Sequence, residues 1–581
     1  MTISSQLEAK LRAALPDDAD ARVQAATDPR FGDYQTNIAM ILAKQQRANP
    51  RQLAQQIIGK LDIAEMCESP EIAGAGFINF RLKPAWLSER FAALAADPQL
   101  GVPAPARPKK FVIDFSSPNV AKPMHVGHIR STILGDALAR IATFIGHAVV
   151  RDNHIGDWGT QFGMLLTGWK AMLDTDALAA DPLGEMERIY KLISALCKTD
   201  PATLEAARQE LVKLQAGDEE NLAIWREMQR LSQTQFDTIY GRLGITFDVS
   251  LGESFYNPWL KDTVQQLRDA GIARESEGAL CVFSDGSVPE KEDPFLISRD
   301  GQWVPMPALV QKADGAANYT TTDLATLEYR LREFAPDEIL YVTDGRQQHH
   351  FRQLFAIFGR WRPAVSARLA HVWFGSILGD DGKPFKTRSG ETIKLAGLLD
   401  EAEERAFLIV TGKNPALPET ERREIARIIG LGAVKYADLL PNRQSDYVFS
   451  WDKMLALQGN TAPYLQYSYV RIRSIFRKAE EGGISSQGSE VSLTEPAELV
   501  LAKKLFQFGE VLPQVLEDHR PNVLCNYLYE LASTFHSFFE ACPVLKADDA
   551  TRASRLTLCE VTARTLQSGL GLLGIGVPER M

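Results

Sequence analysis

The chain has 581 residues, of which 45% are hydrophobic and 9% aromatic, the balance of an ordinary soluble protein of roughly three or four domains. The start of the chain lacks an apolar signal core and no run of about 18 apolar residues follows, so we expect no secretory leader, no membrane span and a cytoplasmic location. The formal net charge of −10 argues against general adsorption to polyanions such as DNA, whereas recognition of one RNA needs only a local basic face. The six cysteines are scattered without a Cys-x-x-Cys pair, which favours reduced thiols over disulfides or a structural metal.

The first predicted unit spans residues 1–105. It opens with a helical stripe of leucines and ends at a loose linker, GVPAPARPKK, at residues 101–110. Within it, GAGFINFRL at residues 74–82 is glycine punctuation followed by an alternating strand. Core packing of Phe77 is the simplest interpretation of that strand.

The next segment predicts a strand, a loop and a helix. Residues 111–115, FVIDF, suit a buried strand, and an apolar series at helical spacing begins after His125-Val126-Gly127-His128. A helix start attracts anions such as phosphate, and two imidazoles there can donate to phosphate oxygens. The small residues Val126 and Gly127 let a nucleotide approach the backbone. A zinc pair is the alternative interpretation, but no Cys or further His follows closely.

The rest of the chain predicts a nucleotide-binding fold interrupted by an insertion. Residues 147–153 are typical of the next parallel strand, which completes a right-handed crossover with its predecessor. A long charged helical region follows, at about residues 165–310. Strands at 337–342 and 369–378, and a helix at 348–361, then resume the fold, and the nucleotide is expected over the carboxyl ends of the strands.

Three later stretches give weaker signals from the residue pattern alone. Tyr319 and Asp323 share one face if a helix starts there, although Thr-Thr-Asp is also typical of a helix cap. The loop GDDGKPFKTRSG at residues 379–390 is typical of a solvated hairpin. From about residue 459 the chain becomes helical, with a flexible loop near 481–490, which alone indicates a helical bundle or an interaction module.

Residues 116–134 resemble the signature of a known family. Their sequence, SSPNVAKPMHVGHIRSTIL, strongly resembles the signature of arginyl-tRNA synthetases, with His125 to His128 as the "HIGH" motif of class I synthetases. FGDYQTNIAMILAK at residues 31–44, HIGDWGTQFG at 154–163 and the closing PERM are similar to the same family.

The resemblance implies a multidomain α/β protein. Its Rossmann-type parallel-sheet catalytic core would span residues 106–458, with the insertion at about 165–310. A small α+β N-terminal domain at 1–105 would contact the D-loop of tRNA, and an all-α helical bundle at 459–581 would bind the anticodon.

The activity implied is that of an arginine–tRNA ligase, which activates arginine with ATP and transfers it to the 3′ end of tRNA(Arg) in translation. Magnesium is expected with ATP, bridging phosphates. L-arginine, ATP and tRNA(Arg) are the implied partners, and we expect a monomer because the chain supplies separate surfaces for both ends of a tRNA.

Site residues follow from the same resemblance. The implied catalytic residues are His125, His128, Lys122 and Lys386. The implied ATP-binding residues are His125, Gly127, His128, Lys122, Lys383 and Lys386. The implied arginine-binding residues are Asp114, Ser117, Asn119, His125, Tyr319, Asp323 and Gln347. The candidate tRNA-binding residues are Phe77, Asn79, Tyr464, Gln466 and Arg471.

One motif departs from the family pattern. The "KMSKS" loop is degenerate here, reading Lys-Pro-Phe-Lys-Thr from Lys383, with its second lysine replaced by Arg388 or absent. In many arginyl enzymes a lysine just before the HIGH motif compensates, and Lys122 stands at that position.

Two competing functions stay open. Small nucleotidylyltransferases share the His-x-Gly-His pattern, but they lack the flanking domains and the Ser-Pro-Asn-Val-Ala-Lys run. A synthetase-like paralogue that only binds RNA is the other alternative. Pyrophosphate exchange with each amino acid, with and without tRNA, separates all three.

Overall fold

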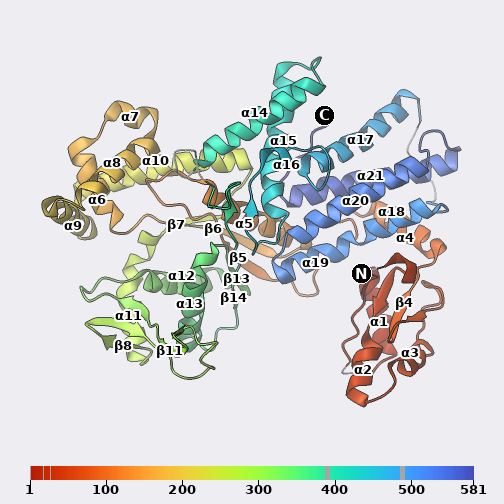
Figure 1. Ribbon diagram of the computed structural model, residues 1–581, viewed down its shortest axis with the longest axis horizontal. Coiled ribbons are helices and arrows are strands. Elements are labelled where there is room, and N and C mark those ends of the chain that lie inside the picture. Colours follow the sequence, from red (N-terminus) through yellow and green to blue (C-terminus); the bar gives the residue numbers. More distant parts are fainter. Residues whose placement is uncertain (1, 17–18, 27, 386–392, 485–490) are drawn as a thin grey trace. The chain divides into compact units, whose positions relative to one another are not determined.

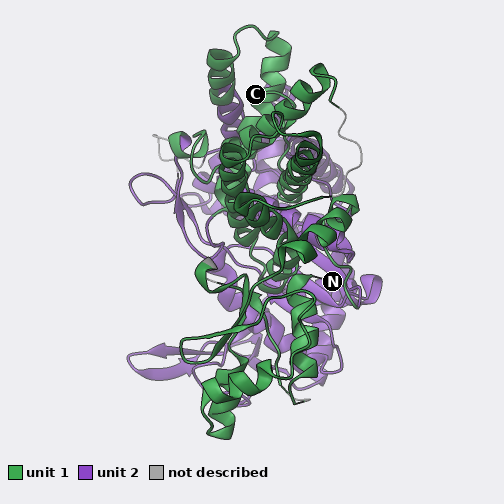
Figure 2. Cartoon of the chain, turned by 90° about the vertical axis from the view of Figure 1, so that its right-hand side faces the viewer, with its two compact units in different colours: residues 1–106, 405–440, 452–581 green, residues 107–404, 441–451 purple. Residues whose placement is uncertain are grey.

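A computed structural model describes residues 2–581 except 17–18, 27, 386–392 and 485–490. The chain forms two compact units (Figure 2). Unit 1 contains Met1–Ala106, Arg405–Leu440 and Asp452–Met581, and unit 2 contains Arg107–Glu404 and Pro441–Trp451. None of the helices in the described ranges combines the length and apolar character that crossing a bilayer requires.

Unit 2 is built on a five-stranded parallel sheet with the order β14-β13-β5-β6-β7 (Figure 1). Its strands are β5 Lys110–Asp114, β6 Ala148–Ile155, β7 Val249–Gly252, β13 Glu338–Tyr341 and β14 Arg368–His371. From β5 the sheet continues through β6 and β7 on one side and through β13 and β14 on the other. This order creates a switch point between β5 and β13, where parallel sheets bind ligands at the carboxyl edge. The predicted Rossmann-type core is confirmed.

Helices connect these strands as the sequence predicted. α5 (Val126–Ile145) links β5 to β6, α12 (Tyr319–Phe334) leads into β13, and α13 (Gln348–Trp361) links β13 to β14. The predicted strand at 369–378 is wrong in its second half. β14 ends at His371, and the short strand β15 (Ile377–Leu378) pairs instead with β16 (Tyr447–Val448) in a separate parallel sheet.

The predicted helical insertion at 165–310 also needs correction. Its first part is helical, with α6 Gln161–Met172, α7 Thr175–Ala180, α8 Pro182–Leu196, α9 Pro201–Gln215 and α10 Glu219–Leu243. β7 then returns to the main sheet, and β8 Ala273–Ser276, β9 Ala279–Val282 and β12 Ala308–Gln311 form an antiparallel sheet. The insertion also contains η2 Glu253–Tyr256, α11 Asn257–Asp269 and the hairpin of β10 Leu296–Arg299 and β11 Gln302–Pro305. Outside it lie η3 Gly345–Gln347 and α14 Leu395–Lys413, which crosses the unit boundary at Arg405. Strands of four residues are too short to establish a period against long helical neighbours.

Unit 1 contains a small α+β part and a helical part. The α+β part has an antiparallel sheet, β1-β2-β4-β3, formed by Gln24–Ala25, Tyr34–Thr36, Phe77–Phe80 and Glu71–Ala73 in that order. Its helices are α1 Ile3–Ala13, η1 Pro29–Phe31, α2 Ile38–Gln46, α3 Pro50–Ile58 and α4 Pro84–Ala96. The helical part comprises α15 Glu419–Leu439, α16 Trp451–Met454, which straddles the unit boundary, α17 Ala462–Glu481, α18 Pro496–Phe506, α19 Phe508–Asp518, α20 Asn522–Ala541 and α21 Asp549–Leu572.

The unit boundaries differ from the predicted domain boundaries in one respect. The first falls at Ala106, beside the predicted linker, but Arg405–Leu440, which we predicted to be catalytic, groups with the helical part. The division into three domains therefore stays a prediction.

Candidate active site

The two histidines of the HVGH turn cap the first turn of α5. The backbone N–H of Gly127 donates to Nδ1 of His125 over 3.0 Å, and the backbone N–H of His125 donates to Nδ1 of His128 over 3.1 Å. The two rings lie side by side, with centroids 4.0 Å apart. Because each Nδ1 accepts a hydrogen bond, the proton of each neutral ring is on Nε2, which becomes a donor.

Both imidazoles are held neutral. Burial lowers the pKa of His128 to about 3, with a further contribution from His125. Burial, and then the charges of Arg346 and Lys122, lower the pKa of His125. The backbone N–H groups of Val126, Gly127 and His128 are already bonded within the protein. At neutral pH the turn therefore offers an anion two ring N–H donors at the positive end of the α5 dipole.

Gly127 allows the first of these caps. A Cβ at this position would lie 2.8 Å from Cε1 and 2.9 Å from Nδ1 of His125. The ring can fold back onto its own helix only because residue 127 has no side chain. This is a steric requirement in addition to the close nucleotide approach that the sequence suggested.

Of the predicted lysines, only Lys122 and Lys383 lie among the described residues, and their surroundings differ. Lys122 is close enough for its charge to lower the pKa of His125, and its Nζ lies 5.2 Å from the centroid of the Tyr190 ring. Lys383 is exposed, and its backbone N–H donates to Asp381. Lys386 lies outside the described residues.

The loop after β5 carries the next predicted residues. Asp114 is buried, and its Oδ1 accepts a hydrogen bond from Oγ of Ser117 over 2.9 Å. Ser116, Ser117 and Ala121 all have positive φ, at 74°, 47° and 61°, a conformation that non-glycine residues rarely adopt and that clusters at functional sites. The loop is thus held in a curve by its surroundings.

Asn119 lies farther along this loop, against the end of β6. It forms an isolated parallel bridge with Gly156, and a Cβ on Gly156 would lie 2.3 Å from Oδ1 of Asn119. Gly156, which the sequence analysis did not single out, therefore leaves the room in which the Asn119 side chain lies.

Tyr319 and Asp323 start α12, as predicted, on one face of the helix. The alternative interpretation as a helix cap is not observed, because Asn318 occupies the N-cap position without a side-chain cap. Oδ2 of Asp323 accepts a hydrogen bond from Nε2 of His350 over 2.6 Å, and the Tyr319 ring lies 4.7 Å from the His350 ring. Gln347, also predicted, is exposed in η3, three residues before His350.

A second carboxyl group lies close enough to Asp323 to be affected by its charge. Glu253 follows β7 directly, and burial, then the charges of Asp323 and Asp157, raise its pKa to about 8. The sequence analysis missed Glu253 because it assigned the strand before it to a helical insertion. Recognition of residues 249–252 as the next parallel strand would have placed Glu253 at the carboxyl edge of the sheet.

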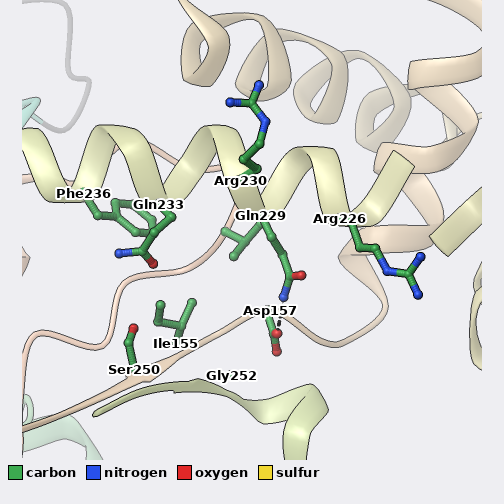
Figure 3. A pocket seen from close by; sticks show the side chains of 10 residues that line it. Ile155, Asp157, Arg226, Gln229, Arg230, Gln233, Phe236, Ser250 and Gly252 are labelled. Atoms are coloured by element: carbon green, nitrogen blue, oxygen red, sulfur yellow. Dashed lines mark hydrogen bonds between the residues drawn. The ribbon is translucent and has the colours of Figure 1, made fainter. Parts of the chain in front are cut away.

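Asp157 is fully engaged within the protein. Its carboxylate accepts from Nε2 of Gln229 over 2.5 Å, and from the backbone N–H and Oγ of Ser254 over 2.8 and 2.6 Å. It lines a pocket of about 480 Å³ between α10 and the ends of β6 and β7, where Figure 3 shows Gln229 aimed at Asp157 and Arg226 and Arg230 directed away from it. Asp323 accepts one hydrogen bond, from His350, and so retains more acceptor capacity than Asp157.

In unit 1 the predicted RNA contacts separate into two classes. Gln466 is 0% exposed, and its Nε2 donates to the carbonyl groups of Ile428 and Gly576, so the prediction that it contacts RNA directly is wrong. Helical periodicity could not show this, because the partners of Gln466 lie 38 and 110 residues away.

The other positions on α17 remain accessible. Tyr464 and Arg471 are partly buried, and Tyr467, which the sequence analysis did not select, is 41% exposed. The Arg471 guanidinium lies 4.8 Å from the centroid of the Phe539 ring on α20. These four residues form an aromatic and cationic patch, which we call the α17 patch.

On β4, Phe77 is partly buried and Asn79 is only 3% exposed. Within the described part of the chain, Oδ1 of Asn79 accepts no hydrogen bond. Asn79 stands between Gln35 and Glu71 in the register of the sheet, so three polar residues cross one sheet face in a row.

Three family models match the chain. One described as tRNA synthetases class I (R), catalytic domain, covers residues 91–451; the DALR anticodon binding domain covers 465–581; and the arginyl tRNA synthetase N terminal domain covers 1–82.

Known proteins match along the whole chain. The arginine–tRNA ligase of Laribacter hongkongensis is 47% identical over 589 residues, covering 100% of both chains, and that of Synechococcus elongatus is 48% identical over 576 residues, covering 97% of this chain and 95% of the relative. The solved arginyl-tRNA synthetases of Plasmodium falciparum and Thermus thermophilus each align with a TM-score of 0.83, at 29% and 26% identity, over 100% of this chain and 98% and 100% of theirs.

The clash at Gly127 gives a stability prediction. Gly→Ala inside an exposed helix normally stabilises by up to about 1 kcal/mol. For Gly127→Ala we expect the gain in the free energy of unfolding to be about 1 kcal/mol smaller than this ordinary value, because the methyl group displaces the His125 ring and removes the cap. The matched control is Gly359→Ala on α13, where a Cβ meets nothing within 4 Å. Urea-unfolding midpoints measure both variants, and equal gains would contradict the proposed role of Gly127.

Proposed function

This chain belongs to the arginyl-tRNA synthetase family, and from that membership we propose that it joins arginine to the 3′ end of tRNA(Arg) at the carboxyl edge of the five-stranded sheet. The arginine carboxylate attacks the α-phosphorus of ATP, which gives arginyl-adenylate and pyrophosphate. The terminal ribose hydroxyl of tRNA then takes the arginyl group and releases AMP. The observation that carries the proposal is the neutral imidazole pair at the start of α5 in the same unit as the carboxyl groups of Asp323 and Glu253, which we take as the acidic pocket.

The imidazole pair serves the phosphate chemistry. Little covalent work falls to the protein in phosphoryl transfer, so positioning and charge stabilisation dominate. Nε2–H groups of His125 and His128 donate to α-phosphate oxygens as their charge grows in the transition state. Lys122 supplies positive charge beside them, Gly127 allows close approach, and Lys383 and Lys386 act from the KMSKS-like loop. Magnesium enters with ATP and bridges phosphates.

The acidic pocket serves the arginine substrate. A guanidinium group is a planar fork of five donors that keeps its charge, so its site needs carboxylates at bidentate geometry. Asp323 and Glu253 meet that need, with Tyr319 and Gln347 beside them. Asp114, Ser117 and Asn119 hold the α-amino group and its surroundings. The compact ammonium of lysine cannot satisfy two carboxylates as a fork can, so lysine is rejected.

Unit 1 provides the contacts to tRNA. The α17 patch stacks on splayed anticodon bases, which suits its aromatic rings and Arg471. Phe77 stacks on a D-loop base. The hydrogen bond expected from Asn79 to that base requires a local rearrangement of β4, because this side chain is buried as Gln466 is. The protein acts as a monomer in the cytoplasm and does not use DNA as a ligand.

Pyrophosphate exchange tests this function as a whole. We expect exchange with arginine only, stimulated by tRNA. Exchange with another amino acid, or tight tRNA binding without any exchange, would contradict the proposal.

Asp323→Ala should raise the KM for arginine roughly 10- to 100-fold, the effect of losing one charged hydrogen bond. The KM for ATP should stay within about twofold, since Asp323 faces the amino acid only. Glu333→Ala, an exposed acid on the same helix, is the control. Equal losses for both substrates would refute the assignment of this pocket.

His128→Ala should lower the rate of arginine activation roughly 10²- to 10³-fold, as the loss of one transition-state donor does. His147→Ala provides the control, because that imidazole stands at the amino edge of the sheet, where its Nδ1 accepts from the backbone of Lys109. Activation within a few-fold of the parent would remove His128 from the catalytic machinery.

The affinity for arginine should depend on pH through Glu253. The free carboxyl group has a pKa of about 8 and is protonated at neutral pH, whereas a bound guanidinium favours its ionised form. Arginine binding therefore releases a proton below pH 8, so affinity rises with pH by at most about tenfold per unit and levels off above 8. Calorimetry in buffers of different ionisation enthalpy measures this release. It should vanish in Glu253→Gln, and persistence there would assign the proton to another group.

A further inference from the structure

Arg330 is an arginine of the protein itself that is buried between α12 and the central strands of the sheet. It is 0% exposed and is the largest fully buried side chain among the residues that the structure describes. Nε donates to Oδ2 of Asp152 over 2.8 Å, and Nη2 donates to Oδ2 of Asp114 over 2.8 Å. The guanidinium carbon lies 5.2 Å from the centroid of the Tyr341 ring.

These contacts join three neighbouring strands. Asp114 ends β5, and in the sheet register it stands opposite both Asp152 of β6 and Tyr341 of β13. Arg330 therefore sits over the switch point of the sheet and holds a carboxylate from each of two adjacent strands. Its planar fork suits that task, because the two donors have a fixed separation and direction.

The charge of this group is maintained inside the protein. Burial alone would lower the pKa of Arg330, but the charges of Asp152 and Asp114 outweigh that effect and raise the pKa well above its ordinary value. Burial of a charge is costly, and well-packed apolar residues often stabilise a core as well as a buried ion pair does. Fold stability alone is therefore a weak reason for Arg330 to be here.

Arg330 shares its helix with the guanidinium side of the pocket. Tyr319 and Asp323 lie in the first two turns of α12, and Arg330 follows Asp323 by seven residues. Seven residues make about two helical turns, so Asp323 and Arg330 point from the same face of α12. The bonds from Arg330 to the strands thus fix where Asp323 stands relative to Asp114.

Arg330 also orients Asp114 itself. Oδ2 of this carboxylate accepts from Arg330, and Oδ1 accepts from Ser117. A carboxylate has about four acceptor positions, so Asp114 retains capacity for an ammonium group while its plane is fixed.

We propose that Arg330 is a positioning residue that holds the α-amino side of the arginine pocket, at Asp114, in register with the guanidinium side, at Asp323. This inference rests on the role proposed above for Asp114. It adds a specificity determinant that touches no substrate. Sequence reasoning missed it because an arginine late in an amphipathic helix is ordinarily a surface residue.

The test compares two ligands in the full-length enzyme. One is arginine, and the other is 5-guanidinopentanoic acid, which is arginine without its α-amino group, measured as a competitive inhibitor. Arg330→Lys keeps the charge, but a point cation cannot hold both carboxylates in a fixed fork. We expect arginine to bind roughly 10- to 100-fold more weakly, while the inhibition constant of the analogue and the KM for ATP change by less than about threefold.

The matched control is Arg332→Lys, an exposed arginine two positions along the same helix, which should change neither ligand. If Arg330→Lys fails to fold, Asp152→Asn replaces it, since that variant loosens the anchor while Arg330 keeps its bond to Asp114. We expect the same selective loss in a smaller amount.

Asp114→Asn distinguishes a failure of the role proposed for Arg330 from a failure of the role proposed for Asp114. If it weakens arginine selectively but the Arg330 and Asp152 variants weaken both ligands equally, or neither, the positioning role is overturned and the role of Asp114 stands. If Asp114→Asn is itself unselective, the assignment of Asp114 to the α-amino group fails, and the inference about Arg330 fails with it.

Discussion

Two backbone N–H groups donate to the Nδ1 atoms of His125 and His128, and the phosphate side of the site depends on this pair of bonds. They fix the tautomer of each ring, keep the Nε2 protons available and leave the helix start without a carboxylate cap that would repel phosphate. An Asp or Ser cap would stabilise the helix as well, but it would add negative charge or fill the space with a shorter donor. In the proposed mechanism the imidazole cap combines helix initiation with anion recognition in the same two side chains.

The proposed arginine side of the site is dominated by carboxyl groups. Asp114, Asp152, Glu253 and Asp323 gather near the carboxyl edge of the sheet, and Arg330 offsets only part of their charge. Burial and the neighbouring charges of Asp323 and Asp157 raise the pKa of Glu253, so this group favours its neutral form. The overall charge of −10 is compatible with a polyanionic partner, because specific recognition needs only a local basic face.

The sequence allowed the sheet core to be predicted because its strands are apolar runs and its helices are long. The predicted ranges agree within a few residues with β5, β6, β13, α5 and α13. β7 was not predicted, because it lies between helices, and Glu253, which follows β7, was missed for that reason. The site is harder to predict, since its key contacts join residues far apart in the chain. Asp323 and His350 are 27 residues apart, and Arg330 and Asp114 are 216 apart. The prediction that Gln466 contacts RNA fails for the same reason, because only the packed bundle shows that its amide donates to carbonyl groups of the protein.

The left-handed backbone at Ser116, Ser117 and Ala121 has a consequence for the limits of the neighbouring elements. Neither an extended strand nor a right-handed helix can propagate through residues in this conformation. β5 therefore cannot lengthen past Phe115, and α5 cannot wind backward as far as Ala121. Backbone stereochemistry thus sets the outer limits of both elements, whichever side chains flank the loop between them.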